Sequence, residues 1–173
     1  MADGSGQEHG PVKHRTTVER TSDREVVVTR TINGPARAVF EAFATAERLR
    51  QWWVPKSMGM ALLSCEVDAR VGGTYRLRFD VGGDEPVAFF GTYIEATPYS
   101  RLAWTNEESG PGGPVTTVTF EENGGTTMVV LREHYPSKEA LDAAGTGGAE
   151  AMFETFDQLD ELLAARGKSS EAS

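Results

Sequence analysis

Alternation of apolar and polar residues predicts a series of short β-strands along most of the chain. In the segment 74–80, Tyr75, Leu77 and Phe79 share one face while charged side chains take the other. This period of two is typical of a half-buried strand. Comparable alternating or β-branched segments recur between breaks that contain glycine or proline. The predicted strands cover residues 25–32, 62–68, 74–80, 87–97, 101–106, 115–121 and 126–135.

Helical patterns follow the first strand and return near the end of the chain. Pro35 suits the first position of a helix that carries Phe40 and Phe43 on one side. A second short helix is expected to end before Pro55, because proline cannot continue it. Residues 148–166 place apolar side chains on one face and charged side chains on the opposite face, which predicts a long amphipathic helix.

This order of elements predicts a single α+β domain over residues 25–166. Short loops between consecutive strands indicate an antiparallel meander. Seven strands need a cover for their apolar face, and the long C-terminal helix is the available cover. We therefore expect a seven-stranded antiparallel sheet against this helix, with two short helices after the first strand. Residues 1–24 are predicted to be a flexible segment, and residues 167–173 a solvated tail.

Charge and composition exclude several classes of function. The formal net charge is −9, and no cluster of Lys and Arg interrupts it. Binding to nucleic acid or to an anionic membrane surface is therefore not expected. No apolar run approaches the roughly 20 residues of a membrane-spanning helix. The N-terminal segment lacks the apolar stretch of a secretory signal. These features together predict a cytoplasmic location.

The sequence offers no pattern for a metal or a nucleotide cofactor. Cys65 is the single cysteine, and its apolar surroundings favour a small core residue over a reactive thiol. His9 and His14 have no spacing that suits a compact zinc site. The pair Gly72-Gly73 matches a hairpin turn rather than a phosphate-binding loop. We expect neither a cofactor nor a metal.

Several short motifs are specific enough to suggest a family. The most specific is Glu66-Val67-Asp68-Ala69-Arg70-Val71-Gly72-Gly73. Others are the opening stretch 27–35, the pair Trp52-Trp53 and the closing stretch 156–163. Together they resemble the START-like, birch-pollen-allergen-like (SRPBCC) superfamily. Within it they are most similar to the branch of homologues of the activator of the heat-shock-protein-90 ATPase.

The resemblance spans about residues 25–165 and implies the helix-grip fold. In that fold a curved antiparallel sheet wraps around the C-terminal helix and encloses a pocket. The sequence departs from the family at Thr45-Ala46-Glu47, where Asp-Pro-Glu is usual, a change that the fold tolerates. Members bind or process diverse small molecules, so the resemblance implies the fold more narrowly than the function.

Strand parity and the implied fold together predict the side chains of the pocket. Adjacent residues at a helix end point in different directions, so one of the two neighbouring tryptophans is expected to line it. The predicted set combines aromatic and aliphatic residues with one charge, which suits a small apolar or aromatic ligand. Its members are Trp52 or Trp53, Tyr75, Leu77, Phe79, Trp104, Phe120, Leu131, Glu133, Met152, Phe153 and Phe156.

Glu133 is the one charged residue predicted to face the pocket. A buried carboxylate is costly unless it is paired or takes up a proton. Arg30 has the matching parity in the first strand, and a structural pair between the two residues is the favoured interpretation. An acid–base role or a role in anchoring a ligand is the alternative.

Three functions remain open at the level of the sequence. The first is a small-molecule binding protein without covalent chemistry of its own. The second is a cyclase-like or hydratase-like enzyme in which Glu133 or Tyr93 supplies a proton. The third is a chaperone-interaction module, which an exposed apolar patch would mark. An exposed edge strand could also support a homodimer.

Overall fold

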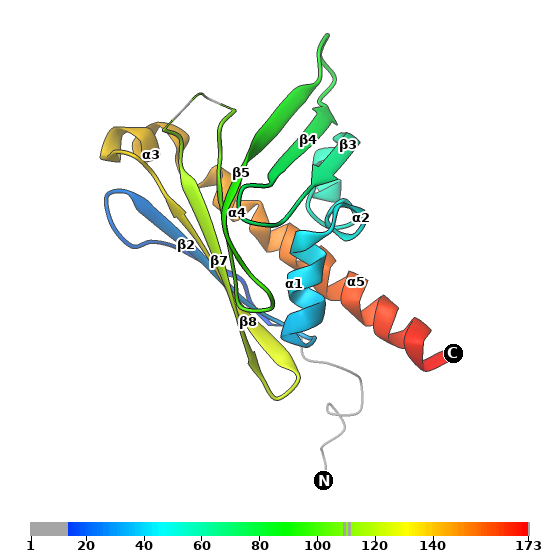
Figure 1. Cartoon of the computed structure of the whole chain (residues 1–173). Coiled ribbons are helices and arrows are strands. Elements are labelled where there is room, and N and C mark those ends of the chain that lie inside the picture. Colours follow the sequence, from blue (N-terminus) through cyan, green and yellow to red (C-terminus); the bar gives the residue numbers. More distant parts are fainter. Residues whose placement is uncertain (1–13, 109, 111, 173) are drawn as a thin grey trace.

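A computed structural model describes residues 14–108, 110 and 112–172, the last six of them as backbone only. An eight-stranded antiparallel sheet forms one layer in the order β1-β2-β8-β7-β6-β5-β4-β3. The C-terminal helix crosses the inner face of this curved sheet, and the first two helices lie beside it (Figure 1). This arrangement confirms the predicted α+β helix-grip fold.

The elements follow the predicted order closely. Strands β4 and β5 coincide with the predicted ranges, and the ends of β3, β6, β7 and β8 differ by one or two residues. The strands are β1 (Thr17–Arg20), β2 (Glu25–Ile32), β3 (Ala61–Val67), β4 (Thr74–Asp80), β5 (Val87–Thr97), β6 (Arg101–Thr105), β7 (Val115–Asn123) and β8 (Thr126–His134). The helices are α1 (Ala36–Ala44), α2 (Ala46–Leu49), the 3-10 turn η2 (Lys56–Met58), α3 (Lys138–Ala144), α4 (Gly147–Glu150) and α5 (Met152–Ala172).

The sheet has eight strands rather than the predicted seven. The additional strand, β1, pairs with the free edge of β2 and lies within the segment 1–24 that was predicted to be flexible. Its four residues include a single apolar one, Val18, so they carry almost no periodic signal. The rest of that prediction, for residues 1–13, falls outside the described residues. At the other end, α5 continues into the stretch 167–173 that was predicted to be a tail.

An aromatic cluster packs α1 and α5 against the sheet. Phe43 of α1 lies at its centre, with its ring centroid 4.8 Å from that of Trp52 and 5.3 Å from that of Phe120 in β7. Phe156 of α5 stacks on Trp52 at 6.0 Å. These four residues are at most 5% exposed. Their burial provides a large share of the hydrophobic stabilisation of the fold.

Arg30 joins β2 to α5 through buried ion pairs. Its side chain is 1% exposed, and its Nη1 donates to Asp157 Oδ1 at 2.8 Å. Its Nη2 donates to Asp160 Oδ2 at 2.6 Å. The hydroxyl of Thr16 accepts a further hydrogen bond from Nη1 at 2.9 Å. The guanidinium group therefore fixes the helix to β2, the strand next to the edge strand β1.

The predicted pairing of Arg30 with Glu133 is wrong. The register of β2 and β8 places Arg30 opposite Val129 and Val26 opposite Glu133. Glu133 thus lies four residues further along β8, which corresponds to about 13 Å of strand. The parity was right and both side chains face inward, but the carboxylates of α5 are closer to Arg30.

Among the described residues, no helix is long and apolar enough to cross a membrane.

Candidate functional site

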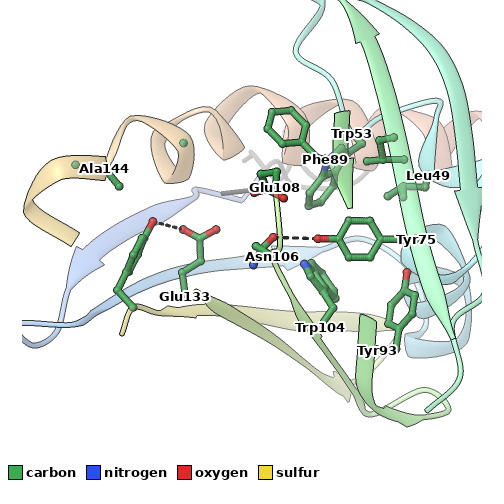
Figure 2. Close-up of a pocket in the computed structure, with 14 residues that line it drawn as sticks. Leu49, Trp53, Tyr75, Phe89, Tyr93, Trp104, Asn106, Glu108, Glu133 and Ala144 are labelled. Atoms are coloured by element: carbon green, nitrogen blue, oxygen red, sulfur yellow. Dashed lines mark hydrogen bonds between the residues drawn. The ribbon is translucent and has the colours of Figure 1, made fainter. Parts of the chain in front are cut away.

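A cavity of about 480 Å³ opens between strands β4 to β6, the end of β8 and the segment that contains α3 and α4 (Figure 2). Its volume falls within the range of small-molecule sites. Aromatic rings form one part of its wall, and polar side chains form another. The lining residues are Leu49, Trp53, Tyr75, Leu77, Phe89, Tyr93, Trp104, Asn106, Glu108, Glu133, Tyr135, Ala144, Gly145 and Gly148.

Four rings form a continuous aromatic wall. Tyr75, Tyr93 and Trp104 come from the neighbouring strands β4, β5 and β6, and their ring centroids lie between 5.8 and 6.3 Å apart. Trp53, which follows α2, lies 6.4 Å from Trp104 with its ring nearly perpendicular. Edge-to-face contacts of this kind hold aromatic side chains in defined orientations. The wall is therefore a preformed surface for an apolar group.

The polar part of the cavity is built on fixed hydrogen bonds. The hydroxyl of Tyr75 shares its proton between the carbonyl of Thr105 at 2.9 Å and the side-chain oxygen of Asn106 at 3.1 Å. The amide nitrogen of Asn106 donates to the carbonyl of Pro114 at 3.0 Å and to the hydroxyl of Thr116 at 2.9 Å. Because all of these contacts agree, the amide has one orientation. Figure 2 shows Asn106 between the aromatic wall and Glu133.

Glu133 has no cationic partner among the residues that the structure describes. Burial raises the pKa of its carboxyl above the ordinary value, and the negative charge of Glu108 adds to the rise. The hydroxyl of Tyr135 donates to Glu133 Oε1 at 3.4 Å and opposes the rise in part. Within the described part of the chain, no Lys, Arg or His forms an ion pair with Glu133. Nor does any group of three His, Cys, Asp or Glu there have the arrangement of a metal site.

Replacing Glu133 with glutamine is expected to stabilise the protein at pH 7 but not at pH 4. Because the folded-state pKa is raised, ionisation of Glu133 opposes folding once the pH exceeds the ordinary value of 4.5. Glutamine removes that penalty and keeps the shape. Thermal unfolding should therefore give a higher melting temperature for Glu133→Gln at pH 7 and equal values near pH 4. Exposed Glu121 in β7 provides the control, since Glu121→Gln should show no such difference. A loss of stability at pH 7 in Glu133→Gln would contradict the assignment.

Two buried polar groups in the aromatic wall have no hydrogen-bond partner among the described residues: Nε1–H of Trp104 and the hydroxyl of Tyr93. These residues are only 7% and 3% exposed. Trp52 differs, because its Nε1 donates to the carbonyl of Ala42 at 2.9 Å in the core. Buried polar groups are nearly always satisfied. Ordered water or a bound molecule completes the hydrogen bonding of such groups.

The structure brings part of the predicted pocket set to the cavity and leaves the rest in the core. The predicted residues that line the cavity are Trp53, Tyr75, Leu77, Trp104 and Glu133. Those that are buried in the core behind it are Trp52, Phe79, Phe120, Leu131, Met152 and Phe156.

The prediction that Phe153 lines the pocket is wrong, because its side chain does not face inward. It is 46% exposed and lies on the outer side of α5, beside Arg30 and Thr16. One residue along a helix turns the side chain by about 100°. Met152 and Phe153 were both predicted to lie on the inner face of the helix. Because they are adjacent, only Met152 faces inward.

Several lining residues were not among the predicted set. Phe89 shares its parity with Tyr93 in β5, and Tyr135 shares that of Glu133, so alternation contained the signal for both. The contribution of α3 and α4 had no such signal, because Ala144 and its neighbouring glycines have no amphipathic pattern. These small residues leave the space that becomes the cavity.

The curved sheet, the gripping helix and the enclosed cavity define a protein of the START-like, SRPBCC class. Residues 33–164 match the model of the family described as Activator of Hsp90 ATPase homolog 1-like protein. The chain belongs to this family. A comparison with curated proteins finds no match.

Solved structures share the fold along most of the chain. A protein from Rhodobacter sphaeroides is 21% identical with a TM-score of 0.77, over 87% of this chain and 98% of that one. Protein Ms6760 from Mycobacterium smegmatis is 22% identical with a TM-score of 0.73, over 87% and 99%. An AHSA1-like protein from Aeromonas hydrophila is 20% identical with a TM-score of 0.59, over 79% and 93%. At these identities the likeness shows the fold alone.

Proposed function

We propose that this protein binds a small apolar or aromatic molecule in the cavity. The observation that carries the proposal is the aromatic wall, which lines a cavity of about 480 Å³ together with the polar side chains of Asn106 and Glu133. Apolar walls with a few convergent polar groups are the usual composition of a ligand site. A ligand that buries about 200 Å² of apolar surface would gain roughly 5 kcal/mol before the costs of association.

Gly148 offers a direct test of the proposal. It lines the cavity, and a Cβ atom built on it meets nothing within 4 Å. A tryptophan at this position would fill the space without displacing the wall. Adjacent Gly147 is equally open but does not line the cavity. Neither glycine has a left-handed φ, so neither substitution strains the backbone.

The expected result is that N-phenyl-1-naphthylamine, a neutral dye that fluoresces in apolar sites, binds the native protein near one per monomer. Gly148→Trp should weaken this binding by about tenfold or more, because the loss of the buried apolar contact is worth at least 1.4 kcal/mol. Gly147→Trp should bind as the native protein does, and both variants should keep the native melting temperature. The proposal would be overturned if the native protein does not bind the dye, or if the Gly148→Trp variant binds it as tightly as the native protein does.

A second candidate is acid–base catalysis in the same cavity. The observation that favours it is the raised pKa of Glu133, beside the hydroxyl of Tyr135 at 3.4 Å. A carboxyl that keeps its proton closer to neutral pH can act as a general acid. If a bound compound is converted, Glu133→Gln should abolish the conversion and leave binding of a neutral product in place. Unchanged conversion in that variant would exclude Glu133 as the acid.

Family membership is also compatible with a co-chaperone-like module, but the aromatic cavity favours a ligand-binding role. A cytoplasmic location and a homodimer remain proposals that rest on composition and on the exposed edge strands.

A further inference from the structure

Among the described residues, the charged groups that line the cavity are all acidic. They are Glu133 and Glu108, and no described Lys, Arg or His lines the cavity with them. Figure 2 shows both carboxylates close to Asn106, at the side of the cavity away from Tyr93. Burial raises the pKa of both Glu133 and Tyr75, and the negative charge of Glu108 adds to the rise at each. Glu133 therefore provides most of the negative potential inside the site, and exposed Glu108 adds a contribution that solvent partly screens.

Nearby basic side chains do not neutralise this region. Arg132 precedes Glu133 but points to the opposite face of the sheet, where it lies 3.6 Å from Glu25. Lys138, at the start of α3, pairs with Asp142 at 2.8 Å. Both residues are about half exposed, so solvent screens them further. These two basic side chains therefore leave the negative potential of the cavity in place, and it favours a positively charged ligand.

The aromatic wall supports the same ligand class. The faces of Trp53, Tyr75, Tyr93 and Trp104 carry negative quadrupole potential, which attracts an organic cation as well as an apolar ring. A bound carboxylate would face two like charges and no cationic side chain of the described lining. The wall and the acidic region therefore select together against anions.

We infer that the cavity is selective for aromatic or aliphatic amines that carry a positive charge. The ammonium group lies at Glu133 and Glu108, and the apolar part lies against Trp53, Tyr75 and Trp104. This inference rests on the proposed binding function and adds to it the charge class of the ligand. The protonated amine gives Glu133 the cationic partner that none of the described residues supplies.

The test uses three molecules with one naphthalene ring and different charge. These are 1-naphthylmethylamine, which is protonated at pH 7, the neutral 1-naphthalenemethanol, and the anionic 1-naphthoate. Each competes with N-phenyl-1-naphthylamine for the native protein. The amine should bind about tenfold or more tightly than the alcohol, since a desolvated charge pair contributes at least that much. The acid should bind more weakly than either.

Glu133→Gln should reduce the advantage of the amine over the alcohol to about threefold or less, with the alcohol unchanged. Glu108→Gln should reduce it in part, and Glu121→Gln, on an exposed position of β7, should leave it intact. Equal binding of amine and alcohol, or tighter binding of the acid, would overturn the inference while the binding function stands. If none of the three displaces the dye and the dye itself does not bind, the binding function fails as well.

Discussion

Arg30→Ala is expected to lower the free energy of unfolding by about 3–5 kcal/mol. The guanidinium is 1% exposed and holds Asp157 and Asp160 of α5 at 2.8 and 2.6 Å. Removing it takes away the guanidinium that Asp157 and Asp160 share in a partly buried space. Urea denaturation of the native protein and the variant measures the difference.

Two further variants distinguish the effect of the buried ion pairs on stability from the effect of removing any arginine charge. Arg70→Ala removes an ion pair with Asp68 in which both side chains are more than half exposed, and it should change stability by less than about 0.5 kcal/mol. Arg30→Lys should recover only part of the loss, because one ammonium cannot replace a planar group that contacts two carboxylates. Equal effects of Arg30→Ala and Arg70→Ala would contradict the proposed role of the buried pair.

Gly91→Ala is expected to destabilise the protein by about 3 kcal/mol or more. A Cβ atom at this position would lie 1.8 Å from the carbonyl oxygen of Thr105 and 2.9 Å from the ring of Tyr75. Tyr75 also donates its hydroxyl to that same carbonyl at 2.9 Å. The absence of a side chain at Gly91 thus allows β5, the end of β6 and the aromatic wall to approach one another.

Gly83→Ala is the matched control. Gly83 has nothing within 4 Å of a built Cβ atom and no left-handed φ, so its substitution should change stability by less than about 0.5 kcal/mol. Dye binding by Gly91→Ala should fall as well, because a displaced Tyr75 opens the wall. A Gly91→Ala protein with native stability would show that the two strands can separate at no cost.

Alternation could predict the strands and the face on which a side chain lies, but not its depth along the strand. Leu131 and Glu133 share one face of β8, and only Glu133 reaches the cavity. In β4, likewise, Tyr75 and Phe79 share one face, and Tyr75 reaches the cavity while Phe79 is buried in the core. Parity repeats every two residues, whereas the boundary between core and cavity depends on where the helices end above the sheet.

Contacts between distant elements explain the remaining differences. Arg30 was correctly assigned to the inner face, but its partner depends on which turn of α5 passes over β2. The spacing of Asp157 and Asp160, three residues apart on one side of a helix, was the available signal. The α3–α4 segment carried no such signal in the sequence. Its alanine and glycine residues shape the cavity by their small size, and small size gives no alternating or helical pattern.

The tryptophan side chains test the central claim most directly, because they divide between the core and the cavity. The chain contains three tryptophans, and each gives one indole N–H signal in a ¹H–¹⁵N spectrum. Single Trp→Phe variants assign these signals, and 1-naphthylmethylamine serves as the titrant. We expect the signals of Trp104 and Trp53 to shift with ligand concentration, since both line the cavity. The signal of Trp52 should stay in place, because its N–H is bonded to Ala42 in the core. A spectrum in which Trp104 does not respond at saturating ligand, or in which Trp52 alone responds, would contradict the account.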